Sequence, residues 1–150
     1  MKKYTLLFFM FLTCIVASVA SCSKERDGQD AEDAALESFF KSYADTCFVN
    51  YDGIYLYVME KGSEEYSEGE TVTIVSTGKT LENIVTFSSG SILQTTYPGS
   101  DLIEGWKIAL KHLKKGDKGI LVVPFKYGFG KKRTGQIEPY STLVYAFEMM

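Results

Sequence analysis

The side chains that could do chemistry in this sequence are mostly aromatic. The chain of 150 residues contains one tryptophan, Trp106, together with ten tyrosines and ten phenylalanines. It contains a single histidine, His112, and three cysteines, of which Cys47 has no evident disulfide partner. Nucleophilic catalysis needs a base beside the nucleophile, and structural zinc needs several Cys or His ligands. The residue types therefore argue against a catalytic dyad or triad and against a bound metal, and they favour a pocket with aromatic walls.

The N-terminus has the pattern of a secretory signal peptide. Two lysines precede an apolar run of 17 residues, 4–20, whose end is rich in Ala and Ser. A membrane-spanning helix is the alternative, but spanning needs about 20 apolar residues. The sequence VAS followed by Cys22 resembles a bacterial lipobox, at which the signal is removed and the cysteine is acylated. We therefore predict a signal peptide over residues 1–21 and lipidation of Cys22.

The lipid anchor predicts where the protein acts. Acyl chains hold a protein on a membrane because each buried methylene contributes about 0.8 kcal/mol. We expect a cell-envelope protein that is attached to the membrane only through this lipid, on the outer membrane and facing the periplasm. Sixteen basic against 19 acidic residues give a net charge of −3, so no nucleic-acid partner is expected. The length suits one domain, which we expect to be monomeric.

The rest of the chain is predicted to hold a polar tether, one amphipathic helix and one α+β domain. Residues 22–32 are polar and show no apolar periodicity, whereas residues 33–47 place apolar side chains three and four positions apart. Residues 48–150 contain short runs typical of strands and a single helical pattern over 102–113. The predicted strands form a mostly antiparallel sheet with one central helix, and they cover residues 54–58, 72–75, 85–87, 118–124 and 142–150.

Four separated motifs within residues 48–150 resemble a known family. They are Leu102-Ile103-Glu104-Gly105-Trp106 on the predicted helix, the strand ILVVP that ends at Pro124, the pair Tyr127-Gly128, and IEP followed by STLVY near the end. In this order they are similar to an FKBP-type peptidyl-prolyl cis-trans isomerase domain. The resemblance implies an FKBP-like antiparallel sheet curved around one central helix. It also implies an isomerase that acts on proline-containing polypeptides and assists the folding of exported proteins.

The chemistry of such an enzyme explains the residue types. Rotation about an X-Pro amide meets a barrier of about 18–20 kcal/mol, and catalysis requires tighter binding of the twisted amide than of the planar one. An apolar cup that excludes water does this without an acid, a base, a metal or a cofactor. The resemblance implies that Trp106 forms the floor of the cup, that the Tyr127 hydroxyl donates to the peptide carbonyl, and that Phe87 completes the catalytic set. It assigns the walls to Leu102, Ile103, Ile137 and Tyr145.

Two positions on the predicted rim of the pocket differ from the family pattern. Ser88 follows Phe87 where the family has an acidic residue, and Ser76 precedes Thr77-Gly78 where the family has a tyrosine. Both serines are counted among the substrate-binding residues. The alternative function is a noncatalytic FKBP-like peptide-binding or chaperone lipoprotein with low or no isomerase activity. A further alternative is an anchored structural lipoprotein.

Overall fold

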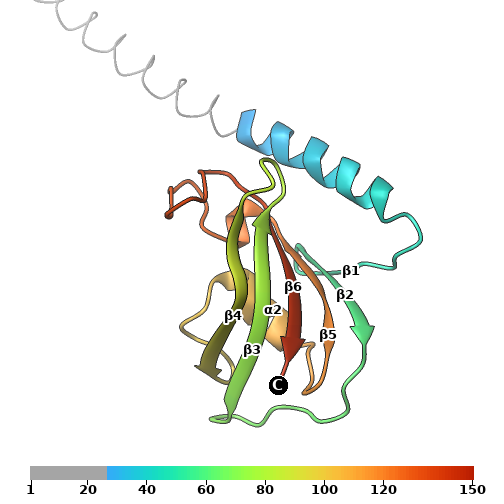
Figure 1. The fold of residues 1–150 in the computed structure, drawn as a ribbon, viewed down its shortest axis with the longest axis vertical. Coiled ribbons are helices and arrows are strands. Elements are labelled where there is room, and N and C mark those ends of the chain that lie inside the picture. The colour runs from blue at the N-terminus through green and yellow to red at the C-terminus, as the bar shows by residue number, and fades with distance from the viewer. Residues whose placement is uncertain (1–26) are drawn as a thin grey trace, which may run out of the picture.

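The computed structural model describes residues 27–150. The predicted signal peptide, the lipidation site Cys22 and the first residues of the predicted tether lie outside the described residues. The described chain forms an N-terminal helix, residues 27–42, and a six-stranded sheet of order β1-β2-β5-β6-β3-β4 (Figure 1). The elements after the helix are β1 (Val49–Tyr51), β2 (Ile54–Glu60), β3 (Thr71–Thr80), β4 (Thr86–Thr96), α2 (Glu104–Leu110), β5 (Lys118–Val123), η1 (Phe125–Tyr127) and β6 (Leu143–Met149).

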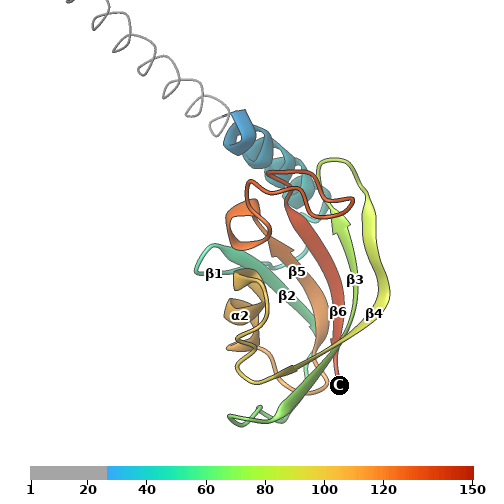
Figure 2. The same cartoon turned by 90° about the vertical axis from the view of Figure 1, so that its left-hand side faces the viewer.

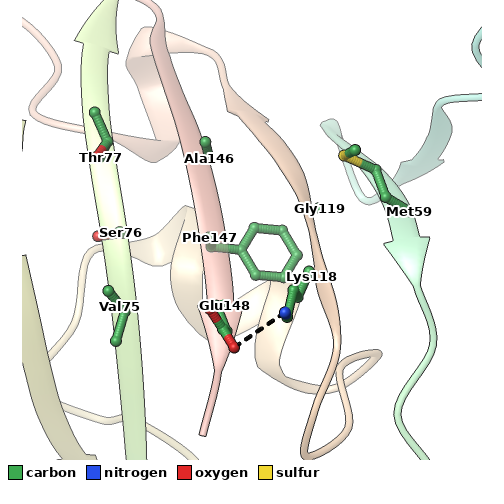
Figure 3. A pocket seen from close by; sticks show the side chains of 9 residues that line it. All are labelled: Met59, Val75, Ser76, Thr77, Lys118, Gly119, Ala146, Phe147 and Glu148. Carbon is green, nitrogen blue, oxygen red and sulfur yellow. Dashed lines mark ion pairs between the residues drawn. The ribbon is translucent and has the colours of Figure 1, made fainter. Parts of the chain in front are cut away.

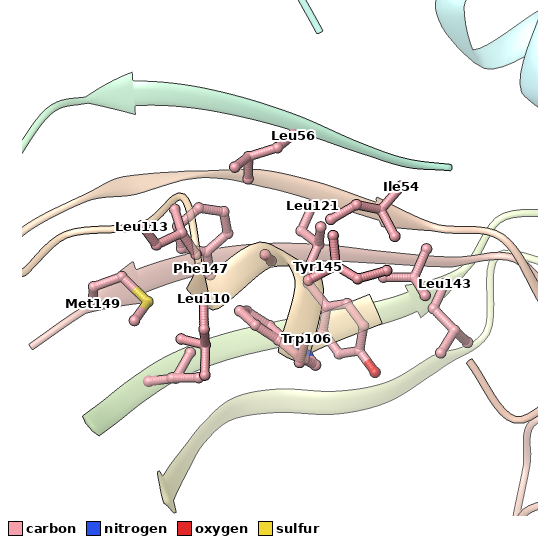
Figure 4. Close-up of a cluster of buried hydrophobic side chains, with 14 of the residues drawn as sticks. Ile54, Leu56, Trp106, Leu110, Leu113, Leu121, Leu143, Tyr145, Phe147 and Met149 are labelled. Atoms are coloured by element: carbon pink, nitrogen blue, oxygen red, sulfur yellow. The ribbon is translucent and has the colours of Figure 1, made fainter. Parts of the chain in front are cut away.

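Every pair of neighbouring strands is antiparallel, which confirms the predicted α+β class. Strand β6 shows how the sequence builds the sheet, because successive side chains of a strand point to opposite faces. Its buried residues alternate with more accessible ones, and they are Leu143, Tyr145, Phe147 and Met149. These four side chains belong to the hydrophobic cluster around α2 (Figure 4). The sheet therefore has one apolar face, which α2 covers (Figure 2).

Helix α2 packs directly on the sheet. A Cβ atom at Gly105 would lie 2.4 Å from Cγ1 of Val123 on β5, so glycine allows this close approach. The Trp106 ring then lies 5.8 Å from the ring of Phe147. The helix is shorter than the predicted 102–113. Leu113 is buried, but it lies in the loop after α2 and not in a further helical turn.

Strand β4 is longer than the predicted 85–87. It continues through the polar sequence SSGS and pairs with β3 from Lys79↔Thr86 to Thr71↔Thr96. Strand β4 is one of the two edge strands of the sheet, and much of it stays exposed, so it needs no regular apolar alternation. The sequence pattern therefore showed only its first residues.

The N-terminal helix begins earlier than predicted. Residues 27–32, assigned to the tether, are helical, and the helix ends at residue 42 rather than 47. Glu32 explains the difference, because this charged residue is 1% exposed and lies against the domain. Farther along, the Phe40 ring lies 4.8 Å from that of Tyr55 on β2. Across residues 27–150 we find no helix with the length and apolarity needed to cross a bilayer.

Candidate active site

A cavity of about 300 Å³ opens beside the N-terminal end of α2. Strands β3, β4 and β6 supply one side of it, the turn before α2 and the helix itself supply another, and the loop after η1 supplies one aromatic side chain. The lining residues are Ser76, Phe87, Ser88, Ser91, Leu93, Asp101, Leu102, Ile103, Trp106, Phe129 and Tyr145. Elements far apart in sequence thus converge on one mainly apolar cavity.

Three aromatic rings fix the shape of this cavity. Trp106 is 3% exposed and Tyr145 is 6% exposed, and their ring centroids are 5.3 Å apart at an interplanar angle of 61° (Figure 4). The Phe87 ring stands edge-on to Tyr145, with centroids 5.6 Å apart at 83°. Edge-to-face pairs of this kind are favourable beyond the area they bury. The base of the cavity is therefore a rigid apolar surface.

Tyr145 also brings a hydroxyl to the cavity. Burial raises the pKa of Tyr145 to about 12, and hydrogen bonding with Trp106 opposes part of this shift. The phenol therefore stays protonated at neutral pH and keeps a proton that it can donate. The indole N–H of Trp106 can only donate, so the Tyr145 hydroxyl accepts in this contact and its own proton is not used in it.

Small polar groups line the rim. The Ser88 and Ser91 hydroxyls are hydrogen-bonded to each other at 2.8 Å between their Oγ atoms. The hydroxyl of Thr95, a buried residue, donates to Oδ1 of Asp101. Asp101 is the one charged residue that lines this cavity. Nowhere in residues 27–150 do three or more His, Cys, Asp or Glu side chains gather as metal ligands.

A second cavity, of about 280 Å³, lies on the other face of the sheet (Figure 3). Val75, Thr77 and Glu148 line it, and each alternates along its strand with residues that face α2. Its charged groups are already paired, with Nζ of Lys118 3.3 Å from Oε1 of Glu148. This surface lacks the aromatic cup, so the cavity beside α2 is the candidate active site.

Comparison with known proteins agrees with this geometry. Residues 62–150 match the family model described as FKBP-type peptidyl-prolyl cis-trans isomerase. The chain belongs to this FKBP family. The matched segment includes β3, β4, α2, β5 and β6, and therefore every residue that lines the candidate active site.

Individual FKBP relatives fall into short and long proteins. FK506-binding protein 1 of Saccharomyces cerevisiae is 38% identical over 87 residues, which are 55% of this chain and 75% of the relative. FkpA of Escherichia coli K12, named as an FKBP-type peptidyl-prolyl cis-trans isomerase, is 30% identical over 143 residues, or 90% of this chain. That match spans 51% of FkpA, so this chain corresponds to about half of the longer relative.

The fold is likewise that of the FKBP family. The crystal structure of FkpA from Escherichia coli superimposes with a TM-score of 0.67 at 29% sequence identity, covering 95% of this chain and 68% of that chain. A peptidyl-prolyl cis-trans isomerase from Pseudomonas syringae pv. tomato gives a TM-score of 0.66 at 22% identity. The predicted FKBP-like fold with a preceding helix is thus confirmed.

Seven of the nine site residues predicted from the FKBP resemblance line the cavity beside α2. They are Ser76, Phe87, Ser88, Leu102, Ile103, Trp106 and Tyr145. The structure thus brings together the predicted floor, most of the walls and both serines of the rim. Their roles in binding or catalysis remain predictions.

Tyr127 and Ile137 are not among the residues that line this cavity. Tyr127 ends η1 and packs over the β1–β2 turn, where a Cβ atom at Gly53 would lie 2.4 Å from the Tyr127 hydroxyl. Ile137 is 4% exposed and belongs to the hydrophobic core. The Tyr127 hydroxyl therefore lies against the β1–β2 turn, outside the lining of this cavity.

Phe129 lines the cavity in place of Tyr127, and the sequence held a signal for it. The chain contains two consecutive aromatic–glycine pairs, Tyr127-Gly128 and Phe129-Gly130, and either could fit the FKBP pattern. Leu93, Ser91 and Asp101 were also missed. Leu93 and Ser91 belong to the part of β4 that the pattern did not predict, and Asp101 directly precedes the predicted Leu102.

Proposed function

We propose that this protein is a peptidyl-prolyl cis-trans isomerase that assists the folding of exported proteins, and that the X-Pro amide rotates in the cavity beside α2. The observation that supports this most is the aromatic cup of Trp106, Tyr145 and Phe87, closed at its base and carrying few charges. A proline ring is apolar and compact, so it suits a cavity of about 300 Å³ with such walls.

Exclusion of water supplies part of the proposed rate acceleration. A planar amide is polar because of resonance, and rotation to the twisted state removes this resonance. A site that replaces water with aromatic surface therefore disfavours the planar amide relative to the twisted one, provided that the rest of the peptide is held. No proton transfer and no covalent intermediate is required.

The Tyr145 hydroxyl supplies the proposed directional contact. It is protonated at neutral pH, it lies at the aromatic cup, and it has a proton to donate. A donor held by the protein costs no reorganisation when the amide rotates. In this mechanism Tyr145 takes the role that sequence reasoning gave to Tyr127.

Replacement of each tyrosine by phenylalanine tests this assignment. Tyr145→Phe keeps the ring and removes the proposed hydrogen bond to the peptide, worth about 0.5–1.5 kcal/mol, so kcat/KM for a prolyl peptide should fall by about two- to twelvefold. Tyr127→Phe is the matched control and should leave kcat/KM unchanged. The assignment is wrong if Tyr127→Phe slows turnover and Tyr145→Phe does not.

A noncatalytic peptide-binding function is the second candidate, and the rim supports it. Ser88 is hydrogen-bonded to Ser91 and brings no charge to a position where the family pattern has an acidic residue. Quenching of Trp106 fluorescence reports peptide binding, and two-dimensional NMR exchange reports the rate of cis–trans interconversion. Quenching without accelerated exchange would favour the binding function. If neither quenching nor accelerated exchange is observed, the anchored structural lipoprotein is the remaining alternative.

The proposed location in the cell envelope depends on Cys22. In this proposal acyl chains on Cys22 attach the protein to the outer membrane, so that the domain meets exported polypeptides in the periplasm. Cys22→Ser should abolish fatty-acid labelling and release the protein from membranes. Labelling that persists in the variant would contradict the lipid anchor and leave the enzymatic proposal intact.

A further inference from the structure

Asp101 gives the candidate active site a fixed negative charge. It lies in the turn before α2, and it is the one charged residue that lines the cavity. The Thr95 hydroxyl donates to its Oδ1 atom. Thr95 itself is 6% exposed, so a buried group of β4 holds one end of this carboxylate.

The Asp101 carboxylate is hydrogen-bonded to Thr95, and Asp101 is nevertheless exposed to solvent. Asp101 is an exposed residue that lines the cavity, so its hydrogen bond with Thr95 leaves the residue open to solvent there. Among the residues from 27 onward, no lysine or arginine forms an ion pair with Asp101. The ion pair on α2 joins two residues of that helix, with Nζ of Lys107 3.5 Å from Oε2 of Glu104. The charge of Asp101 is thus not neutralised by the domain.

From this geometry we propose that Asp101 is a specificity-determining residue, which favours proline segments that carry a lysine or arginine adjoining the proline. The inference rests on the proposed function and names its substrate class. The other lining residues are apolar or neutral, so they hold the proline ring and cannot select a charge. An opposite charge that approaches Asp101 gains Coulomb energy, whereas an acidic neighbour of the proline is repelled.

The size of the preference for lysine peptides follows from the exposure of Asp101 to solvent. Exposed ion pairs contribute modestly and are screened by salt. We expect kcat/KM for a lysine peptide to exceed that for a matched leucine or glutamate peptide by about threefold at low ionic strength. The ratio should approach one as sodium chloride is raised to about 1 M, where the screening length is about 3 Å.

The test uses the full-length protein and two series of short peptides. One series varies the residue before proline and the other varies the residue after it, each with lysine, leucine or glutamate. NMR exchange measures the isomerisation rates without a coupling protease, whose own specificity would bias the comparison. Asp101→Asn keeps an acceptor for Thr95 and removes the charge, so it should bring the ratio of the lysine rate to the leucine rate down to about one.

Glu104→Gln is the matched control. It also removes one negative charge, from an exposed residue that does not line the cavity, and should retain the preference for lysine. The inference is overturned if neither series favours lysine in the parent protein, or if Asp101→Asn keeps the preference. If even the leucine peptides are not accelerated, the proposed isomerase function fails instead. The salt titration needs no variant, so it tests the inference even where Asp101→Asn does not fold.

Discussion

At Gly78 the lack of a side chain lets two aromatic rings of the cavity come together. A Cβ atom on this residue would lie 2.5 Å from the Phe87 ring and 3.0 Å from the Tyr145 ring. No real Cβ atom tolerates the shorter separation, so one ring must move. Phe87 is only partly buried, whereas Tyr145 is enclosed by the core, so Phe87 is the ring that should shift.

We therefore expect Gly78→Ala to change the cavity. Displacement of Phe87 should weaken the binding of a prolyl peptide by about tenfold, the loss of roughly 1.4 kcal/mol of aromatic contact. Titration of Trp106 fluorescence measures this affinity. In a Phe87→Ala background the same change should have little further effect, because the clash is gone. An equal loss of peptide affinity in the parent protein and in Phe87→Ala would show that Gly78→Ala does not act through the Phe87 ring.

Phe129 and Ile137 should respond differently to truncation. Phe129 lines the cavity and is partly buried, so Phe129→Ala should weaken peptide binding with a small loss of stability. Ile137 is 4% exposed in the core, so Ile137→Ala should lower the free energy of unfolding by about 2–5 kcal/mol. Urea denaturation and peptide titration of both variants check this separation. If Ile137→Ala weakens peptide binding and leaves the stability unchanged, the predicted role of Ile137 in the cavity wall is supported instead.

Among the elements, the N-terminal helix is tied to the domain by one buried carboxylate. Oε1 of Glu32 accepts hydrogen bonds from the Phe125 backbone N–H at 2.6 Å and from the Thr142 hydroxyl at 2.7 Å. These partners flank the loop that carries Phe129, so Glu32 joins the helix to both ends of this loop. The backbone N–H of Thr142 donates to a second carboxylate, Glu82, at 2.8 Å.

Removal of the Glu32 carboxylate should therefore destabilise the protein. Glu32→Ala leaves two buried donors without a partner, each costing about 1–3 kcal/mol, so the free energy of unfolding should fall by about 2–6 kcal/mol. Glu32→Gln keeps an acceptor oxygen and should cost less than half of this. Urea denaturation at pH 7 measures both variants. Equal stability of Glu32→Ala and the parent protein would mean that the helix is not held through this residue.

The same carboxylate predicts a dependence of stability on pH. Burial is the main cause that raises the pKa of Glu32 above 4.5, and the negative charges of Glu82 and Asp33 add to it, while its hydrogen bonds to Thr142 and Phe125 act in the opposite direction. Because its pKa is higher in the folded state, protonation of Glu32 favours folding. This contribution is complete below the unfolded pKa of about 4.5 and is lost as pH rises through the raised pKa.

Comparison with Glu32→Gln isolates this group. The difference in unfolding free energy between the parent protein and Glu32→Gln should shift in favour of the parent as pH falls from 7 toward 4.5. Denaturation curves at several pH values measure the difference, and other titrating groups cancel in it. A difference that is constant with pH would contradict the raised pKa.

At the scale of the whole molecule, the N-terminal helix packs against the domain that contains the sheet. The family match begins at residue 62, yet the helix and strands β1 and β2 precede it and pack on the rest. Leu36 of the helix is buried, and the Phe48 ring that follows it lies 5.7 Å from the ring of Tyr57 on β2. These contacts join the preceding segment to the sheet through both apolar and polar groups.

We expect a chain that begins at residue 48 to be less stable than the parent protein. It loses the two hydrogen bonds of Glu32 and the apolar contacts of the helix, together at least about 3 kcal/mol. Circular dichroism during urea denaturation should show one cooperative transition for the parent and a lower midpoint for the shortened chain. Two separate transitions in the parent would indicate that the helix folds independently.

The sequence by itself determined the α+β class, the strands with strong apolar patterns and most of the cavity. Trp106, Leu102 and Ile103 lie on one short motif that carries the FKBP resemblance, so the resemblance assigned all three to the same pocket. Tyr145 was assigned to the wall by the FKBP resemblance, and the alternation of strand β6 buries it on the face that α2 covers. These are properties of neighbouring residues, which sequence patterns report directly.

Only the tertiary structure decided which groups meet across the fold. The direction of Tyr127 and Phe129 depends on the η1 turn, and either aromatic–glycine pair fits the sequence pattern. Glu32 lies in a polar stretch that resembles a tether, and it is buried because Phe125 and Thr142, more than 90 positions away, satisfy its oxygen. Asp101 likewise gains its role from Thr95 on the edge strand. Such hydrogen bonds and ring orientations depend on long-range packing, which leaves no periodic signal in the sequence.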